Sequence, residues 1–507
     1  MQKHYYKNTM YKDKQLYVAH SSDGPIHIIG KMANRHGLIA GATGTGKTVT
    51  LQVLAETFSQ AGVPCFMADM KGDLSGISQA GGLNKFIEKR CTEWKMDTTT
   101  LKFEGCPVRF YDVFGEQGHP MRTTIEKMGA MLLARLMDLN ETQTGILTLT
   151  FRIAKDENLP LIDMKDLRLM LDYVAKNAKR YETIYGNISS ASVGAIQRAL
   201  LALAEQGGDR FFGEPAFDIY DLLQTEGGRG VMNILAADKL MLQPKLYSTF
   251  LMWLLTEIYD KMPEIGDMEL PKMVFFFDEA HMLFKDTSKA LTDKIEQIVR
   301  LIRSKGIGVY FISQSPSDLP ETILGQCGNR VQHALRAFTP KDQAAVKSAA
   351  QTFRPNPAFE TEREILELGT GEALVSFLDE KGAPSIVQKA KILFPLSQIG
   401  AITIEQRNAI NASSRICGKY ETLVDRESAF EQITKQREAE EKAKQETAAQ
   451  EAKEKEEKRK LKQSSRKSQS STGKNILTTV IGTAITYFAK TVATQLARNL
   501  TKKTKKK

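Results

Sequence analysis

The segment that most constrains the fold of this chain is GATGTGKT, which follows the apolar residues 38–40 and precedes a helical pattern over 49–58. The spacing GxxxxGK[ST] in a strand, loop and helix context is typical of a phosphate-binding loop. Glycines let successive backbone N–H groups turn toward phosphate oxygens, and the helix N-terminus adds the positive end of its dipole. The predicted phosphate ligands are Gly41, Ala42, Thr43, Gly44, Thr45, Gly46, Lys47 and Thr48.

Two residues of this loop have further expected roles. The Lys47 ammonium would neutralise β- and γ-phosphate oxygens, and the Thr48 hydroxyl would be a ligand of Mg²⁺. Because phosphates bind where parallel strands lead into helices, the loop also predicts a wound α/β sheet. We therefore expect a nucleotide site that takes ATP and Mg²⁺.

The second half of such a site is expected at the end of another buried strand, and MVFFFDEAH has this pattern. Five apolar residues lead directly into Asp278 and Glu279. We expect Asp278 to reach Mg²⁺ through its water shell and Glu279 to polarise the attacking water. An acidic helix N-cap after a core strand is the alternative. The adjacent Asp-Glu pair favours an additional-strand ATPase of RecA-like type over a small GTPase or a nucleotide kinase.

Two more polar residues follow apolar runs. Gln314, in VYFISQSP, could contact the γ-phosphate and move a loop when that phosphate leaves. Asp69, in FMADMKGD, would face the same crevice between strands. The alternatives are local: Gln314 could satisfy backbone groups of the Ser-Pro turn, and Asp69 could belong to turn chemistry.

Phosphoryl transfer also needs positive charge on the transition state, often from an arginine of a neighbouring subunit. In ALTDKIEQIVRLIRSKG the apolar stripe leaves Arg300 and Arg303 off the core face. Arg330, in CGNRVQ, is the competing candidate.

Short apolar runs alternate with helical patterns from residue 37 onward, which predicts one large, mainly parallel sheet. The runs are 38–40, 65–68, 108–113, 230–235, 273–277, 309–313 and 373–377. The predicted fold class is α/β, with a RecA-like additional-strand P-loop NTPase core. The expected segments are short N-terminal strands (1–35), the core (36–400) with a helical insertion (about 120–225), a connector (401–425), a charged helix or disordered linker (426–474), and a basic amphipathic helix with a Lys-rich end (475–507).

Composition excludes several classes of protein. The first twenty residues contain no apolar signal region, and no stretch reaches the roughly 18 apolar residues of a membrane span. The five cysteines form no CxxC pair and the seven histidines no ligand-spaced pair, so we expect neither disulfides nor a transition metal. A cytoplasmic location follows from these patterns, with peripheral membrane contact left open.

Charge is concentrated at the C-terminal end. The net charge is +10, yet residues 462–507 contain eleven Lys or Arg and no Asp or Glu, so residues 1–461 sum to −1. Apolar residues recur every four positions over 476–500, which predicts an amphipathic helix. This end could contact an anionic membrane surface or a protein partner, or pack on its own protein.

Taken together, the motifs resemble the HerA/FtsK branch of RecA-like ATPases, and more closely the bacterial YjgR-like group. Stretches from LIAGATGTGKT through DMKGDLSG, FFFDEAHMLF and VRLIRSKGIGVYFISQSP to GEALVSFLDEKGAPS carry the resemblance over about residues 20–395. The resemblance implies hexameric rings, with Asp69 as an active-site acid, Glu279 as the catalytic glutamate and Arg303 acting in trans. About 35 residues precede the phosphate loop, too few for the β-barrel of HerA, so the resemblance does not decide whether a nuclease partner exists.

Three functions compete at this stage. The first is an ATP-hydrolysing ring motor on double-stranded DNA. The second is an ATP-gated scaffold or membrane-surface switch, favoured by the near-neutral charge of residues 1–461. The third, a phosphotransferase, has no second-substrate motif to support it.

Overall fold

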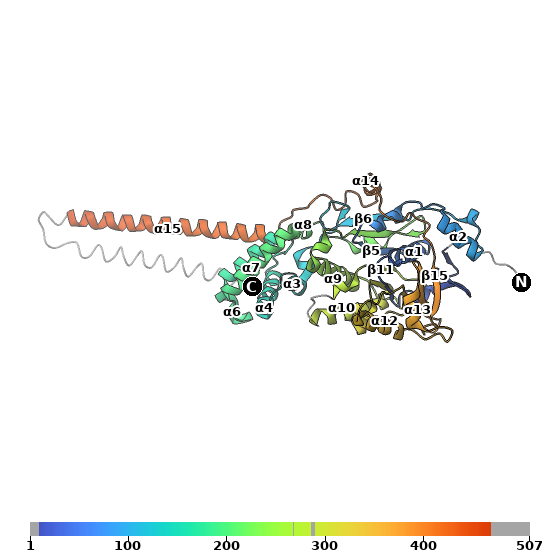
Figure 1. The fold of residues 1–507 in the computed structure, drawn as a ribbon. Helices are drawn as coiled ribbons and strands as arrows, with labels where there is room; N and C mark the ends of the chain where they lie inside the picture. The colour runs from blue at the N-terminus through green and yellow to red at the C-terminus, as the bar shows by residue number, and fades with distance from the viewer. Residues whose placement is uncertain (1–9, 267, 285–288, 468–507) are drawn as a thin grey trace. The chain divides into compact units, whose positions relative to one another are not determined.

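The computed structural model describes residues 10–266, 268–284 and 289–467, and the chain divides into two compact units, Met1–Ile433 and Thr434–Lys507. The predicted amphipathic helix over 475–507 lies outside the described residues. The first unit is built on one sheet of thirteen strands (Figure 1). Among the described residues, no helix is both long and apolar enough to cross a membrane.

Eight strands of the sheet run parallel to one another, as the sequence predicts. In spatial order they are β13 (Asn329–Gln332), β4 (Gly37–Ala40), β12 (Ile307–Ser313), β11 (Met273–Phe277), β5 (Cys65–Asp69), β10 (Met232–Ala236), β6 (Val108–Asp112) and β7 (His119–Pro120). Each of the first six apolar runs identified in the sequence contributes one of these strands.

The remaining strands extend the sheet in antiparallel fashion beyond β13. They are β14 (Glu372–Ser376), β15 (Gln388–Ile392), β2 (Gln15–Ser21), β1 (Tyr11–Lys12) and β3 (Gly24–Ile29). The run over 373–377 is therefore a strand, but it lies antiparallel to β13. A run of apolar residues indicates burial and does not encode strand direction, which explains the difference.

Both faces of the parallel region are covered, which is why its strands are apolar at every position. Alternate side chains of β11 point to opposite faces. Phe275 and Phe277 belong to a core formed with α9 (Pro244–Lys261) and α10 (Lys289–Ile302). Val274 and Phe276 belong to the other core, formed with α1 (Lys47–Gln60).

A group of helices between β7 and β8 (Thr225–Glu226) forms the insertion. It comprises α3 (Ile125–Leu136), α4 (Glu141–Asp156), α5 (Met164–Lys176), α6 (Ala178–Tyr185), α7 (Ser190–Leu203) and α8 (Asp209–Phe211). Its apolar faces are continuous with the core of α9 and α10. The remaining helices of the first unit, apart from short 3₁₀ turns, are α2 (Lys85–Trp94), α11 (Glu321–Leu324), α12 (Pro340–Gln351), α13 (Thr361–Glu367) and α14 (Ile404–Ser413). The short strand β9 (Arg229–Gly230) pairs with β8.

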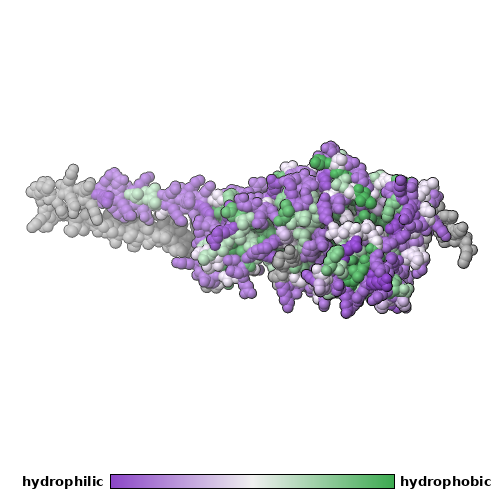
Figure 2. Space-filling model, in the orientation of Figure 1, coloured by the Kyte–Doolittle hydropathy of each residue, from purple (hydrophilic) through white to green (hydrophobic). Residues whose placement is uncertain are grey.

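The charged segment after the connector is helical in the described part, as α15 (Ala429–Lys467). Its first turn packs in the first unit, where the buried carboxylate of Asp166 accepts hydrogen bonds from Ser428 Oγ and from the N–H of Phe430. Further along, the pair Lys460 and Glu456, 3.0 Å apart, is typical of its exposed surface. The visible surface of α15 is almost wholly hydrophilic (Figure 2). Such a helix is stabilised by solvation and i,i+4 pairs instead of by burial.

Candidate nucleotide-binding site

The predicted site residues gather at one edge of the sheet. Strands β4, β12, β11 and β5 are neighbours in this order, and all four are parallel. Their carboxyl ends lead into the phosphate loop (41–48), Gln314, the pair Asp278 and Glu279, and Asp69, respectively. In an open α/β sheet this edge is where ligands bind.

The phosphate loop has the backbone conformation that its glycines permit. Gly41 has a φ of 156° and Gly46 a φ of 114°, in the region that residues with a Cβ rarely adopt. A Cβ on Gly41 would also lie 2.5 Å from the Cβ of His333. The Lys47 ammonium donates to the carbonyls of Gly41, at 2.7 Å, and Ala42, at 3.1 Å. Lys47 thus lies along the loop, at the start of α1.

Residues at the end of β13 and the start of β14 contact the phosphate loop and the helix α1 that follows it. The N–H of Gly371 donates to the Thr45 carbonyl at 3.0 Å. His333 donates from Nδ1 to the Glu372 carbonyl at 2.9 Å, which leaves Nε2 as the acceptor for Thr50 Oγ1 at 2.8 Å. Burial lowers the pKa of His333 to about 4, so the ring is neutral near pH 7. The sequence analysis did not identify His333, because the only local signal was a polar residue directly after an apolar strand.

The acidic pair follows β11 directly. The N–H of Glu279 donates to Asp278 Oδ1 at 2.9 Å, and Glu279 has a φ of 47°, which is uncommon for a residue other than glycine. Burial and the neighbouring Glu279 raise the pKa of Asp278 to about 6, while Lys71 and Lys47 act in the opposite direction. Glu279 Oε2 is buried without a hydrogen bond and lies 3.5 Å from His281 Nδ1. Backbone strain and buried, unsatisfied carboxylates are features that accumulate at functional sites.

Asp69 ends β5 and is also incompletely satisfied. Its side chain is 2% exposed, and no hydrogen bond of normal geometry reaches either carboxylate oxygen. Burial, followed by the charge of Asp73, raises the pKa of Asp69 to about 6. The N–H groups of Gly72 and Lys71, followed by the charge of Arg407, act in the opposite direction on this pKa. A buried carboxylate that is so poorly hydrogen-bonded is costly, so its presence at this edge points to a role with a ligand.

Gln314 follows Ser313 at the end of β12 and is exposed. The turn after it is stabilised by Asp318, which accepts from Ser313 Oγ at 2.6 Å and from the N–H of Ser315 at 2.9 Å. The Ser-Pro turn is therefore capped by a residue other than Gln314. Because Ser313 pairs with Ala40, the backbone of Gln314 lies beside the start of the phosphate loop.

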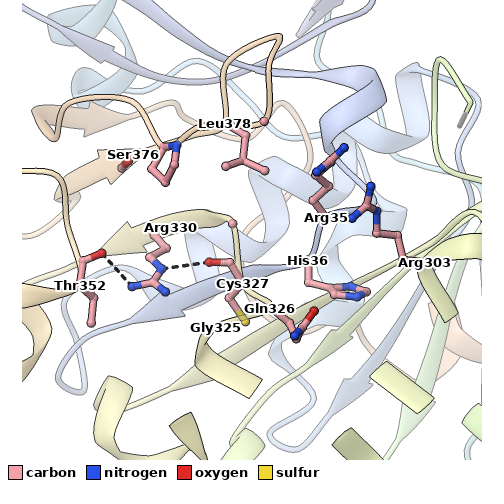
Figure 3. A pocket seen from close by; sticks show the side chains of 13 residues that line it. Arg35, His36, Arg303, Gly325, Gln326, Cys327, Arg330, Thr352, Ser376 and Leu378 are labelled. Carbon is pink, nitrogen blue, oxygen red and sulfur yellow. Dashed lines mark hydrogen bonds between the residues drawn. The ribbon is translucent and has the colours of Figure 1, made fainter. Parts of the chain in front are cut away.

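The candidate arginines lie at the opposite edge of the same sheet. Arg303 follows α10 and precedes β12, and Arg330 is near the start of β13. Together with Arg35 they line a cavity of about 280 Å³, in which the side chains of Arg35 and Arg303 lie beside each other (Figure 3). The seven residues of β12 separate this edge from the phosphate edge by about 20 Å. Arg303 therefore cannot reach the phosphate loop of its own chain.

Arg330 is held within this cavity by backbone carbonyls. Its Nε, Nη1 and Nη2 donate to the carbonyls of Cys327 at 2.9 Å, Thr352 at 2.9 Å and Leu324 at 2.8 Å. Burial lowers its pKa. The guanidinium thus links three segments of the chain, which indicates a role in stabilising the fold. Arg300 lies on the exposed side of α10.

The residues at the phosphate edge fit a magnesium-bound nucleoside triphosphate. The loop offers backbone N–H groups and one ammonium to phosphate oxygens, and Thr48 and Asp278 supply the oxygen ligands that Mg²⁺ prefers. The unsatisfied oxygens of Asp69 and Glu279 provide acceptors for water or for a metal-bound ligand. This donor set, with β12 inserted between the phosphate-loop strand β4 and the acidic strand β11, defines a RecA-like P-loop nucleoside triphosphatase.

Comparison with known proteins places the chain within this class. The family described as helicase HerA-like C-terminal matches residues 14–504. The chain therefore belongs to the helicase HerA-like C-terminal family and is a P-loop ATPase by class. The finer placement in the YjgR-like group remains a prediction.

Two curated relatives are similar to parts of the chain. A probable helicase of Methanocaldococcus jannaschii, MJECL08, is 30% identical over 122 residues, which are 23% of this chain and 22% of the relative. The DNA double-strand break repair helicase HerA of Sulfurisphaera tokodaii is 23% identical over 360 residues, which are 70% of this chain and 64% of the relative. The chain thus spans less than two thirds of either relative.

Among solved structures, the plasmid coupling protein TrwB in complex with ADP and Mg²⁺ has a TM-score of 0.51 at 16% identity, over 78% of this chain and 92% of TrwB. TrwB in complex with the non-hydrolysable ATP analogue ADPNP has a TM-score of 0.51 at 18% identity, with the same coverage. At these identities the likeness confirms the RecA-like fold.

Proposed function

We propose that this protein hydrolyses ATP with Mg²⁺ and uses the hydrolysis to move along double-stranded DNA as a ring of subunits, most simply a hexamer. The observation that carries the proposal is the division of the site between two edges of one sheet. The phosphate loop and the acidic residues are at one edge, and Arg303 is about 20 Å away at the other. Arg303 can therefore act on the phosphates only from a second copy of the chain.

Each residue at the phosphate edge has a definite task in this proposal. The N–H groups of the loop bind the phosphates, and Lys47 turns from its carbonyl partners toward the β- and γ-phosphate oxygens. Thr48 and Asp278 hold Mg²⁺, which, when bound, neutralises charge on the phosphate oxygens. Glu279 orients the attacking water and accepts its proton, for which the unsatisfied Oε2 is suited.

Three residues complete the cycle. Asp69 supplies a second carboxylate on the side of β11 away from β12. Gln314 contacts the γ-phosphate and reports its loss to the loop after β12. Arg303 of the neighbouring subunit stabilises negative charge in the transition state. The DNA role is supported by family membership and by HerA and TrwB, the first of which is described as a DNA repair helicase.

The test is steady-state ATP hydrolysis by the full chain and by a chain ending at residue 461, each with and without linear duplex DNA, with Glu279→Gln as the control. A DNA-coupled motor predicts several-fold stimulation in both proteins and none in the control. The affinity of the protein for DNA should fall steeply with the logarithm of the salt concentration, also in the chain that lacks residues 462–507. Hydrolysis that ignores duplex DNA in both proteins would contradict the motor.

A second function is favoured by the charge distribution, because residues 1–461 have a net charge of −1 and the basic residues are concentrated after residue 461. In this alternative, ATP controls assembly, and residues 475–507 bind an anionic membrane surface or a protein partner. Co-sedimentation with vesicles containing anionic lipid separates the two functions. The switch predicts binding that is lost with residues 462–507 and changes with the nucleotide.

A further inference from the structure

The helix α2 brings a column of one cation and two aromatic rings close to the phosphate loop, and neither the motifs nor the comparisons assign it a role. The guanidinium carbon of Arg90 lies 5.1 Å from the centroid of the Phe86 ring and 5.4 Å from that of Trp94. The three residues are four positions apart, so they share one face of α2. Arg90 is 6% exposed, and its Nη1 is buried without a hydrogen-bond partner.

A glycine directly before β14 connects the α2 column to the phosphate loop. The N–H of Gly371 donates to the Thr45 carbonyl at 3.0 Å. A Cβ on Gly46 would lie 3.4 Å from the Cα of Gly371, and a Cβ on Gly371 would lie 3.6 Å from Arg90 Nη2. Because a C–C bond is about 1.5 Å long, Arg90 Nη2 is within about 10 Å of the Gly46 Cα. The column therefore lies on the β14 side of the loop.

The packing of α2 holds the column in this position. Cys91 is buried in the core that also contains α1. Glu93 pairs with Lys391 of β15 at 2.7 Å. The rings of Trp94 and Phe394 are stacked, with centroids 6.1 Å apart and an angle of 7° between their planes. The end of α2 is thus attached to β15 and to the segment that follows it.

The site residues also give the direction of a bound triphosphate. Gln314 and Glu279 follow β12 and β11, so in the proposed function the reacting γ-phosphate lies on that side of the loop. The nucleoside is at the other end of the triphosphate, and it is therefore expected toward β13 and β14. The Phe86 ring, next to Arg90 on this side, is 53% exposed. An exposed aromatic ring beside a guanidinium is suited to stacking with a nucleobase.

We propose that the nucleobase of ATP stacks on the exposed face of the Phe86 ring, and that Arg90 holds this ring from its other face. Phe86 is then a binding residue of the ATPase site and Arg90 a positioning residue. Because every base has a π-face, the subsite recognises a base without selecting adenine. The inference rests on the proposed function and deepens it, since it names the part of the site that takes the nucleoside.

The experiment measures the affinity of the full chain for ADP and for inorganic triphosphate, each with Mg²⁺, by isothermal titration calorimetry. Phe86→Ala should weaken ADP binding about tenfold, in the range of one base stacked on an aromatic ring, and leave the affinity for inorganic triphosphate unchanged. Phe86→Trp should keep the affinity for ADP. Arg90→Met should also weaken ADP alone, and Arg90→Lys should recover part of the loss, because it keeps the cation but not the planar guanidinium.

Phe430→Ala is the matched control. The Phe430 ring is also exposed and also has a cation beside it, since Lys165 Nζ lies 5.4 Å from its centroid, but it belongs to the first turn of α15, which packs on the helical insertion. This variant should bind both ligands like the wild type. Thermal unfolding of each variant checks the fold.

Two results would overturn the inference. One is an unchanged affinity for ADP in Phe86→Ala, and the other is an equal loss of affinity for ADP and for inorganic triphosphate, which would indicate damage to the phosphate loop. A wild-type chain that binds ADP but hydrolyses ATP no faster than Glu279→Gln would instead refute the proposed function, while the difference between the two ligands would still test the subsite.

Discussion

The two edges of the parallel sheet are built in opposite ways. At the phosphate edge, Glu279 has a strained backbone, and buried carboxylate oxygens of Asp69 and Glu279 have no hydrogen-bond partner. At the arginine edge, all three nitrogens of the Arg330 guanidinium donate to carbonyls. The first edge is costly to the folded chain by itself, and the second holds the chain together.

This contrast separates groups kept for a ligand from groups kept for stability. Buried carboxylate oxygens without a hydrogen bond lower stability unless a ligand pairs with them, so Asp69 and Glu279 mark the phosphate edge as the site. Within the arginine edge, Arg330 donates to three carbonyls of its own chain, and Arg303 lines the same cavity. Four predictions test this comparison.

The largest effect is expected for Arg303→Ala. Loss of a trans-acting arginine should lower kcat for ATP by about 10³ to 10⁵-fold, with nucleotide binding retained. Mixing Arg303→Ala with Glu279→Gln should restore part of the activity, because some interfaces then combine an intact Glu279 with an intact Arg303. Phosphate release by the mixture measures this, and a mixture no more active than its components would argue against a shared site.

Glu279→Gln should lower kcat by about 10² to 10⁴-fold, because the amide cannot accept a proton from water. The affinity for a fluorescent ADP analogue should change little, since the substitution leaves the phosphate loop intact. Phosphate release and equilibrium binding measure the two quantities. Weaker nucleotide binding with undiminished kcat would show that Glu279 contributes to binding and not to chemistry.

Arg330→Met should destabilise the protein by about 2 to 4 kcal/mol, because three buried carbonyls lose their donor. The melting temperature should fall, while kcat per folded molecule should stay near that of the wild type. Arg300→Met, at an exposed position on α10, is the control and should melt like the wild type. If Arg330→Met were as stable as the wild type but no longer hydrolysed ATP, Arg330 would have a role in catalysis.

Asp69→Asn should raise stability, in contrast to Arg330→Met, which should lower it. The folded-state pKa of Asp69 is raised from 3.8 to about 6, so the ionised carboxylate destabilises the fold as pH rises through that interval. Replacement by the neutral amide should therefore raise stability by up to roughly 3 kcal/mol at pH 8, and by less at pH 5. Thermal melts at the two pH values test this, with hydrolysis expected to fall in parallel. A lower melting temperature at pH 8 would show that Asp69 stabilises the fold.

Much of the site could be predicted from the sequence because its chemistry is local. The residues of GATGTGKT are contiguous, and their glycines are needed for the φ values of Gly41 and Gly46. MVFFFDE places two carboxylates directly after a strand that is apolar on both faces. The same reason explains why we correctly predicted the family resemblance, the α/β class and the additional strand. The motifs that indicate them each occupy one short segment of the sequence.

The sequence by itself thus determined most of the parallel strands, the phosphate loop, and the acids at the ends of β11 and β5. Tertiary structure alone decided that β14 runs antiparallel, that Arg303 and Arg330 share a cavity, and that His333 contacts the helix of the phosphate loop. The physical reason is the distance along the sequence over which the deciding interactions act. Backbone period and turn chemistry depend on neighbours in sequence, whereas strand order and the meeting of distant side chains depend on how the whole core is buried.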